Sequence, residues 1–538
     1  MLERLVENWL TRTTERALEI PFCQMLTAEG HRVVHLSRHG PFEQGKDIIS
    51  VDPNGLVCAY QLKSIGPKLN QHQWEELVPQ ITRLVEIPVT HPSVIPGSPH
   101  EPFFVVNGEL DEEVRREIAD RNSAWTARNY RPLRTIVRGE LLTRLTTLQT
   151  AFWPSPLTFE RDLLQLFLSD GRACLDKPRH LSFLSRLVPL GEDAPEPREL
   201  PRSLASAAIF NTYALAPHTE ADNHVAVVEG WTVFIALLTA VASKHPAEAQ
   251  AIDDVMALAL YAADGALDDL VQELKARDHF IEGNALVDAP FYRGRLTWLL
   301  SLVSVRELIK LSRNPGGEVD GWAVEFVDKH LPNTLLWGEA AFPQYLAMAL
   351  FLNQVKPPNT YDGLIFHVLD AILSANSPSH PLGLPDPYHD LTDVVRMHTG
   401  ITKSSDLENF KGRSYILLPA IYLLASKGWR QKIARLWPEI SRIAFAEFRV
   451  TEAWQTCLWR SEQGDLRLIV PKTPQSWAEL RDSARTIDMS LIPAFLAAHP
   501  EILLLFTIVY PHRLTADVAG FLDRHFKEVK ISSRSTLL

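Results

Sequence analysis

Residues 45–49, Gly45-Lys46-Asp47-Ile48-Ile49, and residues 59–63, Ala59-Tyr60-Gln61-Leu62-Lys63, decide how this chain folds at its amino end. The turn sequence Asp52-Pro53-Asn54-Gly55 lies between them, so the three pieces together predict a β-hairpin. Gln61 and Lys63 are two residues apart and share one face of the second strand. The pattern predicts an acid, a second oxygen donor and a lysine at one edge of a sheet.

This set of side chains suits metal-assisted hydrolysis of a phosphodiester. Mg²⁺ prefers oxygen ligands and keeps several waters, so one or two carboxylates and a neutral carbonyl are enough. Asp47 is the expected first ligand, and the side chain of Gln61 and the backbone carbonyl of Leu62 lie beside it. Lys63 is expected to orient or deprotonate the attacking water, or to stabilise the charge that develops on phosphorus.

Length and charge limit the classes of protein to consider. A chain of 538 residues is long enough for two to four domains. Its formal charge of -11 argues against a protein coated in positive charge, so a nucleic-acid surface must be local. The four cysteines are far apart in sequence, which indicates neither a zinc site nor a disulfide framework and favours a reducing cytoplasm.

The sequence predicts no membrane segment and no signal peptide. Residues 1–16 are charged throughout and lack an apolar core. The most apolar later stretch, residues 491–510, carries His499, Pro500 and Glu501 at its centre. We therefore expect two buried helices that meet at a proline turn.

The first 148 residues predict an α/β unit. Apolar residues recur at helical spacing up to Gly30, which is expected to end the helix. The expected strands are residues 32–36, 47–51, 56–62, 102–108 and 133–137. The expected later helices are residues 73–85, 109–122 and 139–148.

Residues 155–538 predict a large all-α region. Long apolar stripes at helical spacing replace the strand patterns, and no fixed repeat period emerges. The expected architecture is an irregular helical scaffold, with a degenerate solenoid as the open alternative. The polar, proline-rich residues 191–201 predict a linker that subdivides this region.

The amino-terminal residues carry a family resemblance. Glu19, Gly30-His31-Arg32-Val33, Gly45-Lys46-Asp47-Ile48 and Gln61-Leu62-Lys63, in this order, resemble the PD-(D/E)xK nuclease superfamily and specifically its Mrr-like restriction endonuclease branch. In that branch a glutamine typically stands two residues before the lysine. Residues 103–108 and 135–142 are similar to the closing strand and helix of such domains. The resemblance covers residues 1–148 only.

The resemblance implies a restriction-endonuclease-like fold and a complete active site. It implies an active-site set formed by Glu19, Asp47, Gln61 and Lys63. It implies Mg²⁺, for which Mn²⁺ can substitute, held by Glu19, Asp47, Gln61 and the backbone carbonyl of Leu62. Glu15, one helical turn before Glu19, is the alternative acid on the first helix.

The resemblance also implies a substrate and a setting. The expected activity is Mg²⁺-dependent cleavage of DNA, in restriction or antiphage defence. A double-strand cut needs two active sites, which predicts a homodimer. Two alternatives stay open: a catalytically inactive nuclease-like protein that only binds, and a nuclease that acts on RNA.

Each active-site residue also has an ordinary structural interpretation. Asp47 could pair with Lys46 or cap a turn. Lys63 could be a surface residue that protects an edge strand from aggregation. The agreement of order, spacing and expected elements favours the catalytic interpretation.

A basic and aromatic segment is the candidate nucleic-acid surface of the first unit. Its arginines are Arg115, Arg116, Arg121, Arg128, Arg131, Arg134 and Arg138. Arg128, Arg131 and Arg134 lie beyond the acidic run and are the better candidates for phosphate contacts. The alternative is a solvated helix face that nearby glutamates neutralise.

The sequence of the helical region shows no recognisable catalytic motif, so we expect this region to serve recognition. Asp386, His389 and Asp393 resemble metal ligands, but Asp390 is a natural N-cap for the helix that follows. The scaffold is expected to bind a protein partner or activator, a nucleic acid, or a second copy of the chain.

Overall fold

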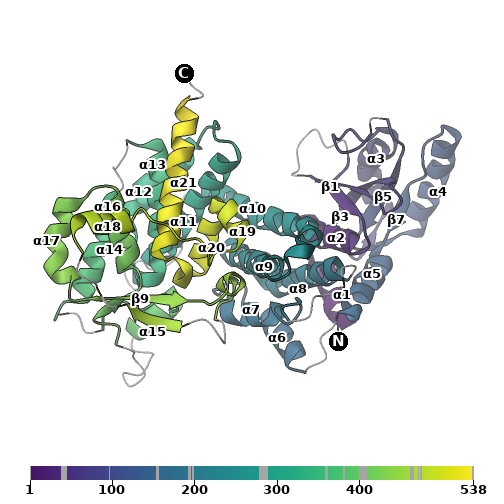
Figure 1. Cartoon of the computed structure of the whole chain (residues 1–538). Coiled ribbons are helices and arrows are strands. Elements are labelled where there is room, and N and C mark those ends of the chain that lie inside the picture. Colours follow the sequence, from purple (N-terminus) through teal and green to yellow (C-terminus); the bar gives the residue numbers. More distant parts are fainter. Residues whose placement is uncertain are drawn as a thin grey trace. The chain divides into compact units, whose positions relative to one another are not determined.

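A computed structural model describes most of the chain. The described residues are 2–37, 45–95, 97–152, 157–191, 196, 199–277, 289–357, 362–379, 382–398, 409–460, 466–470, 472 and 475–535. They form two compact units (Figure 1). Unit 1 comprises Met1–Asn223 and His245–Ala262, and unit 2 comprises His224–Lys244 and Ala263–Leu538.

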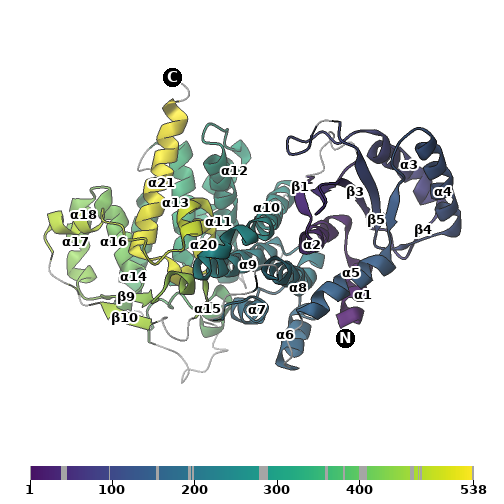
Figure 2. The same ribbon diagram turned by 45° about the vertical axis from the view of Figure 1, so that its right-hand side comes forward.

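Unit 1 begins with the expected α/β arrangement (Figures 1 and 2). Its elements up to residue 151 are α1 (Leu2–Arg12), α2 (Glu15–Ala28), β1 (Arg32–Leu36), β2 (Ile48–Val51), β3 (Val57–Lys63), β4 (Lys68–Leu69), α3 (Gln71–Glu86), β5 (His100–Val106), β6 (Glu109–Leu110), α4 (Glu112–Ala127), β7 (Arg134–Ile136) and α5 (Arg138–Ala151). The expected strands and helices are all present, and β4 and β6 add a small parallel pair.

The main sheet of unit 1 is mixed, with the order β1-β2-β3-β5-β7. Strands β1, β2 and β3 are antiparallel neighbours, whereas β3, β5 and β7 run parallel. The predicted hairpin between β2 and β3 forms, and Asp52 accepts hydrogen bonds from the backbone of Asn54 and Leu56 in its turn. A local register shift between Val33 and His35 in β1 precedes the undescribed residues 38–44.

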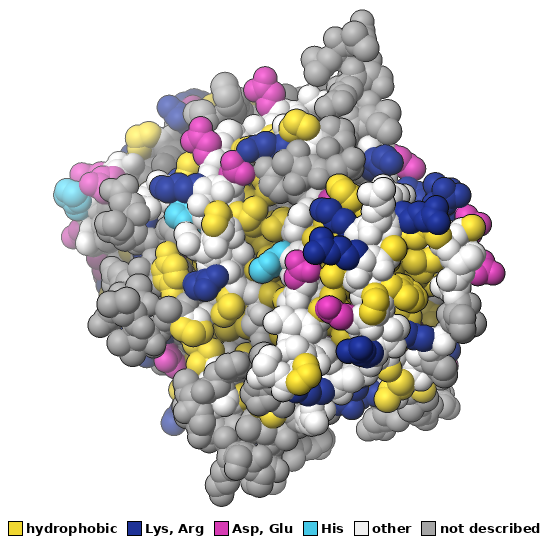
Figure 3. Space-filling view, turned by 90° about the vertical axis from the view of Figure 1, so that its left-hand side faces the viewer, with side chains coloured by type: hydrophobic (Ala, Val, Ile, Leu, Met, Phe, Trp, Pro, Cys, Tyr) yellow, Lys and Arg dark blue, Asp and Glu magenta, His cyan; other side chains and the backbone are white. Residues whose placement is uncertain are grey.

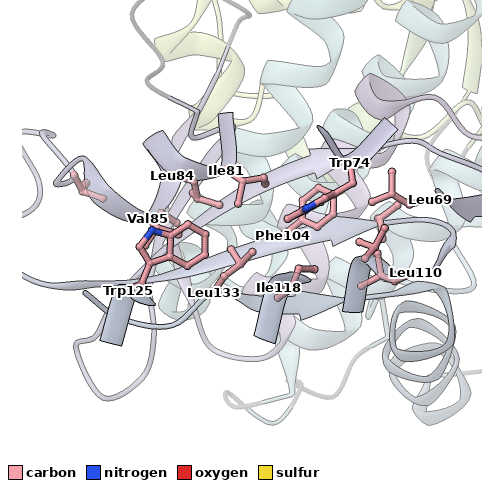
Figure 4. Packing of buried hydrophobic residues seen from close by; sticks show 14 of the residues in the cluster. Leu69, Trp74, Ile81, Leu84, Val85, Phe104, Leu110, Ile118, Trp125 and Leu133 are labelled. Atoms are coloured by element: carbon pink, nitrogen blue, oxygen red, sulfur yellow. The ribbon is translucent and has the colours of Figure 1, made fainter. Parts of the chain in front are cut away.

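Helices α3 and α4 cover one face of this sheet with the main hydrophobic core of the α/β part. Figure 4 shows Trp74 beside Leu69 and Leu110, and Trp125 beside Val85. The helix α2 covers the other face, where the rings of Phe22 and Tyr60 lie 5.2 Å apart. A sheet covered on both faces explains why β3 is buried along almost its whole length.

The first helix differs from the expectation of one continuous segment. It breaks at Thr13 and Thr14, and the Thr14 side chain caps α2 by accepting a hydrogen bond from the amide of Ala17. Threonine is favoured as an N-cap because its oxygen satisfies an amide that lacks a helical partner. Gly30 follows the end of α2 with a φ of 88°, as expected for a glycine that closes a helix.

The rest of unit 1 is helical and extends beyond the predicted domain boundary at residue 148. It contains α6 (Leu157–Phe167), α7 (Lys177–Leu184), α8 (Leu200–Glu220), η1 (Pro246–Ile252) and the start of α10 (Asp253–Ala276). Helix α8 packs along α2, and the Tyr261 hydroxyl donates to the Ser37 carbonyl at 2.7 Å. Much of the predicted linker near 191–201 lies outside the described residues.

Unit 2 is mainly helical. Its helices are α9 (His224–Lys244), the end of α10, α11 (Ala289–Arg313), α12 (Gly321–His330), η2 (Leu331–Asn333), η3 (Glu339–Ala341), α13 (Phe342–Val355), α14 (Asp362–Ala375), α15 (Leu391–His398), α16 (Leu417–Ser426), α17 (Arg430–Ile440), η5 (Ala453–Cys457), α18 (Trp477–Ser483), α19 (Ala494–Ala498), α20 (Pro500–Val509), η6 (Pro511–Arg513) and α21 (Ala516–Ser535). The expected pair of helices around Pro500 corresponds to α19 and α20.

The expectation of an all-α region is wrong in one place, because unit 2 also contains a small sheet. Strands β8 (Arg413–Ser414), β9 (Ala444–Arg449) and β10 (Leu466–Val470) form it in the order β10-β9-β8. The rings of Tyr415 and Phe448 stack 4.3 Å apart beside it. These strands are short and lie between helices. The alternation of side chains that marks a strand is therefore hard to distinguish in the sequence from the helical patterns around it.

Helix α9 is long and apolar enough to cross a membrane by length and composition. Its most apolar window is 83% buried within the protein, and the helix packs against α20 and η5.

The four cysteines are free, and Cys174 alone among them is exposed.

A buried ion pair fixes the carboxyl-terminal helix in unit 2. The Lys427 ammonium lies 2.9 Å from Asp362 and 3.0 Å from Asp523 of α21. The Trp429 indole also donates to Asp362 at 2.7 Å. Removing one partner of a buried pair typically costs about 3–5 kcal/mol, so this contact specifies how α14, α16 and α21 meet.

Gly45 should be more sensitive to substitution than an open glycine in a similar backbone conformation. Its φ is 76°, and a Cβ would lie 2.6 Å from the Gln80 carbonyl oxygen in α3. Gly55 has a φ of 84° with open space around it, so Gly55→Ala reports backbone strain alone. We expect Gly55→Ala to lower the unfolding free energy by about 1–2 kcal/mol, and Gly45→Ala by about 1–3 kcal/mol more.

Urea denaturation followed by tryptophan fluorescence measures both losses. An equal loss in the two variants would show that the close approach of Gly45 to α3 does not contribute to stability.

Candidate active site

Asp47 stands directly before β2 and is held between two neighbouring strands. Its amide donates to the Tyr60 carbonyl at 2.8 Å, and its carbonyl accepts from the Ser37 amide at 2.7 Å. Ile48 pairs with Tyr60 in the antiparallel register. The same register places the preceding residue, Asp47, opposite Gln61. The side chain is 4% exposed, so the backbone fixes this carboxylate in a nearly buried position.

Two donors of β3 hold the Asp47 carboxylate. The Gln61 side-chain nitrogen donates to Oδ2 at 2.6 Å, and the Leu62 amide donates to the same oxygen at 2.7 Å. The N–H and C=O of one strand residue point to the same side, so the Leu62 carbonyl also points toward Asp47. Asp47 and Leu62 are therefore neighbours at the end of β3, and their role as cation ligands stays a prediction.

Lys63 ends β3 and contacts an acid on α2. Its ammonium lies 2.8 Å from the Glu15 carboxylate, and the two side chains are 17% and 28% exposed. The pair is thus partly open to solvent at the carboxyl end of the parallel strands. The structure brings Asp47, Gln61 and Lys63 together, and it adds Glu15.

Asn107 connects this strand end to the start of α2. Its side-chain amide donates to the Leu10 carbonyl at 2.9 Å, and its oxygen accepts from the Ile65 amide at 2.8 Å. The Ser64 hydroxyl donates to the Thr13 carbonyl at 2.7 Å. These bonds hold the junction of α1 and α2 beside Lys63 and so position Glu15.

Glu19 lies one turn further along α2 and is buried, at 3% exposure. It shares a helix face with Glu15 and with Phe22, which packs on Tyr60 of β3. Burial, together with the nearby Glu19 carboxylate, raises the pKa of the Cys23 thiol. Glu19 therefore faces the sheet close to the site, while the recorded contact of Lys63 is with Glu15.

The set of oxygen donors suits a hard cation better than a soft metal. Carboxylate, amide and backbone oxygens at this strand end are the ligand types that Mg²⁺ and Mn²⁺ bind. The part of the chain that the structure describes contains no group of three or more His, Cys, Asp or Glu side chains placed to hold a metal. A cation here would have few protein ligands and would need water or substrate oxygens to complete its coordination.

The predicted nucleic-acid residues lie apart from this site. Arg134 pairs in register with Phe103, whereas Lys63 pairs with Val106 three residues further along β5. Three strand residues correspond to about 10 Å. Arg128 and Arg131 contact Glu86 and Glu101, at 3.2 and 3.5 Å. These arginines lie toward the amino ends of the parallel strands, and the Arg134 guanidinium lies 5.5 Å from the ring centre of Phe103.

The acidic and histidine cluster in unit 2 forms a structural network. The Asp386 carboxylate contacts His389 at 2.8 Å and Arg467 at 2.9 Å. Asp390 accepts from the amide of Asp393, and Asp393 accepts from the amide of Asp390, at the start of α15. These contacts match a capped helix start, in agreement with the capping role predicted for Asp390.

The sequence pattern favours Glu19 over Glu15 and assigns no role to Asn107 or Ser64. The signal for Glu15 was the pair Thr13-Thr14, a capping sequence that starts a new helix immediately before it. The signal for Asn107 was a polar residue at the end of an apolar strand, where a buried amide usually bonds backbone groups.

No protein-family model, curated protein or solved structure matches this chain.

Lys46 should make the stability of the protein depend on pH. Burial lowers its pKa from 10.5 to about 8, and its ammonium donates to the Arg83 carbonyl at 3.4 Å. Between these two values the unfolded chain binds more protons at this residue, so stability rises with pH across that interval. At about 1.36 kcal/mol per pKa unit, the rise is at most about 3 kcal/mol.

We expect Lys46→Met to be more stable than the wild type at pH 7 and to lack this rise between pH 8 and 10. Urea unfolding of both proteins at several pH values measures the difference. Parallel stability curves for the two proteins would contradict a buried ammonium beside the site.

Proposed function

We propose that unit 1 is a metal-dependent endonuclease that hydrolyses phosphodiester bonds of DNA, with a restriction-endonuclease-like fold of the Mrr-like kind. The observation that carries the proposal is the cluster of Asp47, Gln61 and Lys63 at the end of β3. The order of the main sheet, an antiparallel β1-β2-β3 followed by parallel β5 and β7, supports it.

Each residue of the cluster has a distinct role in the proposed reaction. Asp47 and the Leu62 carbonyl provide oxygens for a divalent cation, and Gln61 orients the Asp47 carboxylate through its 2.6 Å hydrogen bond. The Lys63 ammonium stands where it can hold the attacking water or stabilise negative charge on phosphorus. Glu15 positions that ammonium at 2.8 Å.

Mg²⁺, or Mn²⁺ in its place, supplies neutralisation of phosphate charge and activation of water when it is bound. Asp47 and the Leu62 carbonyl would hold it, with Glu19 as the further acid close by. Because these ligands are few, oxygens of the DNA phosphate would complete the set, as substrate phosphates commonly do at Mg²⁺ sites.

The proposed setting is restriction or antiphage defence in the cytoplasm. Cleavage of both strands of a duplex uses two active sites, so two copies of the chain act together. Unit 2 is the proposed recognition part, which binds the target or a protein activator.

Alanine at Asp47 or Lys63 should abolish Mg²⁺-dependent cleavage of plasmid DNA. Loss of a cation ligand or of a proton-transfer group lowers rates by about 10²–10⁴-fold. The matched control is Lys68→Ala, because Lys68 is an exposed lysine that pairs with Asp111. Circular dichroism and thermal unfolding establish that each variant is folded. Full activity in either site variant would overturn the assignment.

Glu15 and Glu19 can be separated by isosteric substitution. If Glu15 positions Lys63, Glu15→Gln should slow cleavage at saturating Mg²⁺ about 10-fold or more, because the ammonium loses the carboxylate that holds it in place. Glu19→Gln should leave that rate in place and raise the Mg²⁺ concentration needed for half-maximal cleavage. The reverse pattern would assign Glu19, and not Glu15, to Lys63.

A further inference from the structure

The segment from Lys411 to Arg449 in unit 2 has a charge opposite to that of the whole chain. It contains eight Lys and Arg and two Glu, a formal charge of +6, whereas the chain carries -11. Helix α17 and the turn after it lie within this segment, and α17 packs on α16 (Figures 1 and 2). The local excess of positive charge is what an otherwise acidic protein needs in order to approach a polyanion.

The exposed side of α17 carries these charges in a helical row. Lys432 and Arg435 are three residues apart and lie along one side of the helix, and Arg442 follows in the turn after the helix; all three are exposed. Arg430 is exposed at the start of the helix. Ile433 and Ile440 are buried on the opposite side and attach the helix to the unit. We call Arg430, Lys432, Arg435 and Arg442 the α17 basic row.

Other basic residues of the segment have acidic partners. Lys427 is neutralised by Asp362 and Asp523, and Arg449 lies 2.7 Å from Glu447. Among the described residues, no ion pair or side-chain hydrogen bond involves Arg430, Arg435 or Arg442. Glu439 lies in the same row and offsets part of its charge. The row still keeps a net charge of +3.

Aromatic side chains lie next to the row. The Lys432 ammonium is 4.2 Å from the ring centre of Phe366 and 4.6 Å from that of Trp429. Trp429 and Trp437 are half-buried. Figure 3 views the molecule from the side on which α17 lies in Figure 1, and hydrophobic side chains reach the surface there between Lys and Arg side chains. These cation–π contacts hold the Lys432 ammonium at the surface of the row.

We propose that the α17 basic row is a DNA-binding surface through which unit 2 contacts the phosphate backbone of the substrate. From Arg430 to Ile440 the helix rises about 15 Å at 1.5 Å per residue, which corresponds to about four base pairs at 3.4 Å each. The contact is to phosphates and so is independent of base sequence. The choice of DNA rests on the proposed nuclease function, whereas the binding itself needs no cleavage.

The test measures binding of a fluorescent 25-base-pair duplex by anisotropy, using the full-length chain with Asp47→Ala so that no cleavage interferes. In this background we compare Arg430→Gln/Arg435→Gln/Arg442→Gln with the control Arg277→Gln/Lys310→Gln/Lys356→Gln. Both triple variants lower the formal charge by three. The control cations are ion-paired with Glu273, Glu307 and Asp328 elsewhere in unit 2.

We expect the row variant to bind at least 10-fold more weakly in 0.1 M salt. The slope of log K against log salt should fall by about 2–3, since each lost phosphate contact removes about 0.9. The control should keep the affinity and the slope of its parent. Equal weakening of both variants would show that binding depends only on the net charge of the protein, and would overturn the proposal. The proposal would also fail if the row variant bound as tightly as its parent, or if the parent did not bind the duplex.

An RNA duplex of the same sequence is the second arm. Binding of RNA without binding of DNA would overturn the assignment to DNA. If the wild type fails to cleave but the row variant loses DNA binding as described, the proposed nuclease function fails and the binding surface stands.

Discussion

The carboxylate of Asp47, held by two donors of β3, is the interaction on which the rest of unit 1 depends. The Gln61 nitrogen and the Leu62 amide reach the same oxygen at 2.6 and 2.7 Å. Hydrogen bonds to a charged group contribute about 1.5–3 kcal/mol each, so this contact fixes the start of β2 against the end of β3. The proposed cation site is built on this carboxylate.

The chemistry of the site comes from segments far apart in the sequence. Lys63 extends from the same strand end and contacts Glu15 of α2. Asn107 and Ser64 bond the backbone of the α1–α2 junction and hold that acid in place. The buried core between the sheet, α3 and α4 supports the strands from behind (Figure 4). A partly exposed lysine on a rigid strand end is an arrangement that a DNA phosphate can approach.

Local signals explain which features could be predicted from the sequence. The hairpin of β2 and β3 has turn residues at Asp52 to Gly55 and alternating faces, so Asp47, Gln61 and Lys63 could be placed together. The contact between Glu15 and Lys63 could not, because it depends on the tertiary bonds of Asn107. The strands of unit 2 were missed because β8 has two residues and pairs with a distant β9. Likewise, α8 joins unit 1 through packing on α2, and α6 and α7 pack on α8, which no local pattern shows.

The most direct test of the central claim is incubation of the purified wild-type chain with supercoiled plasmid DNA in Mg²⁺ and, in parallel, in EDTA. Single-stranded DNA and RNA serve as competing substrates. The account predicts nicked and linear plasmid in Mg²⁺ or Mn²⁺, intact plasmid in EDTA, and little cleavage of RNA. Cleavage that persists in EDTA, or cleavage of RNA with the plasmid left intact, would contradict it.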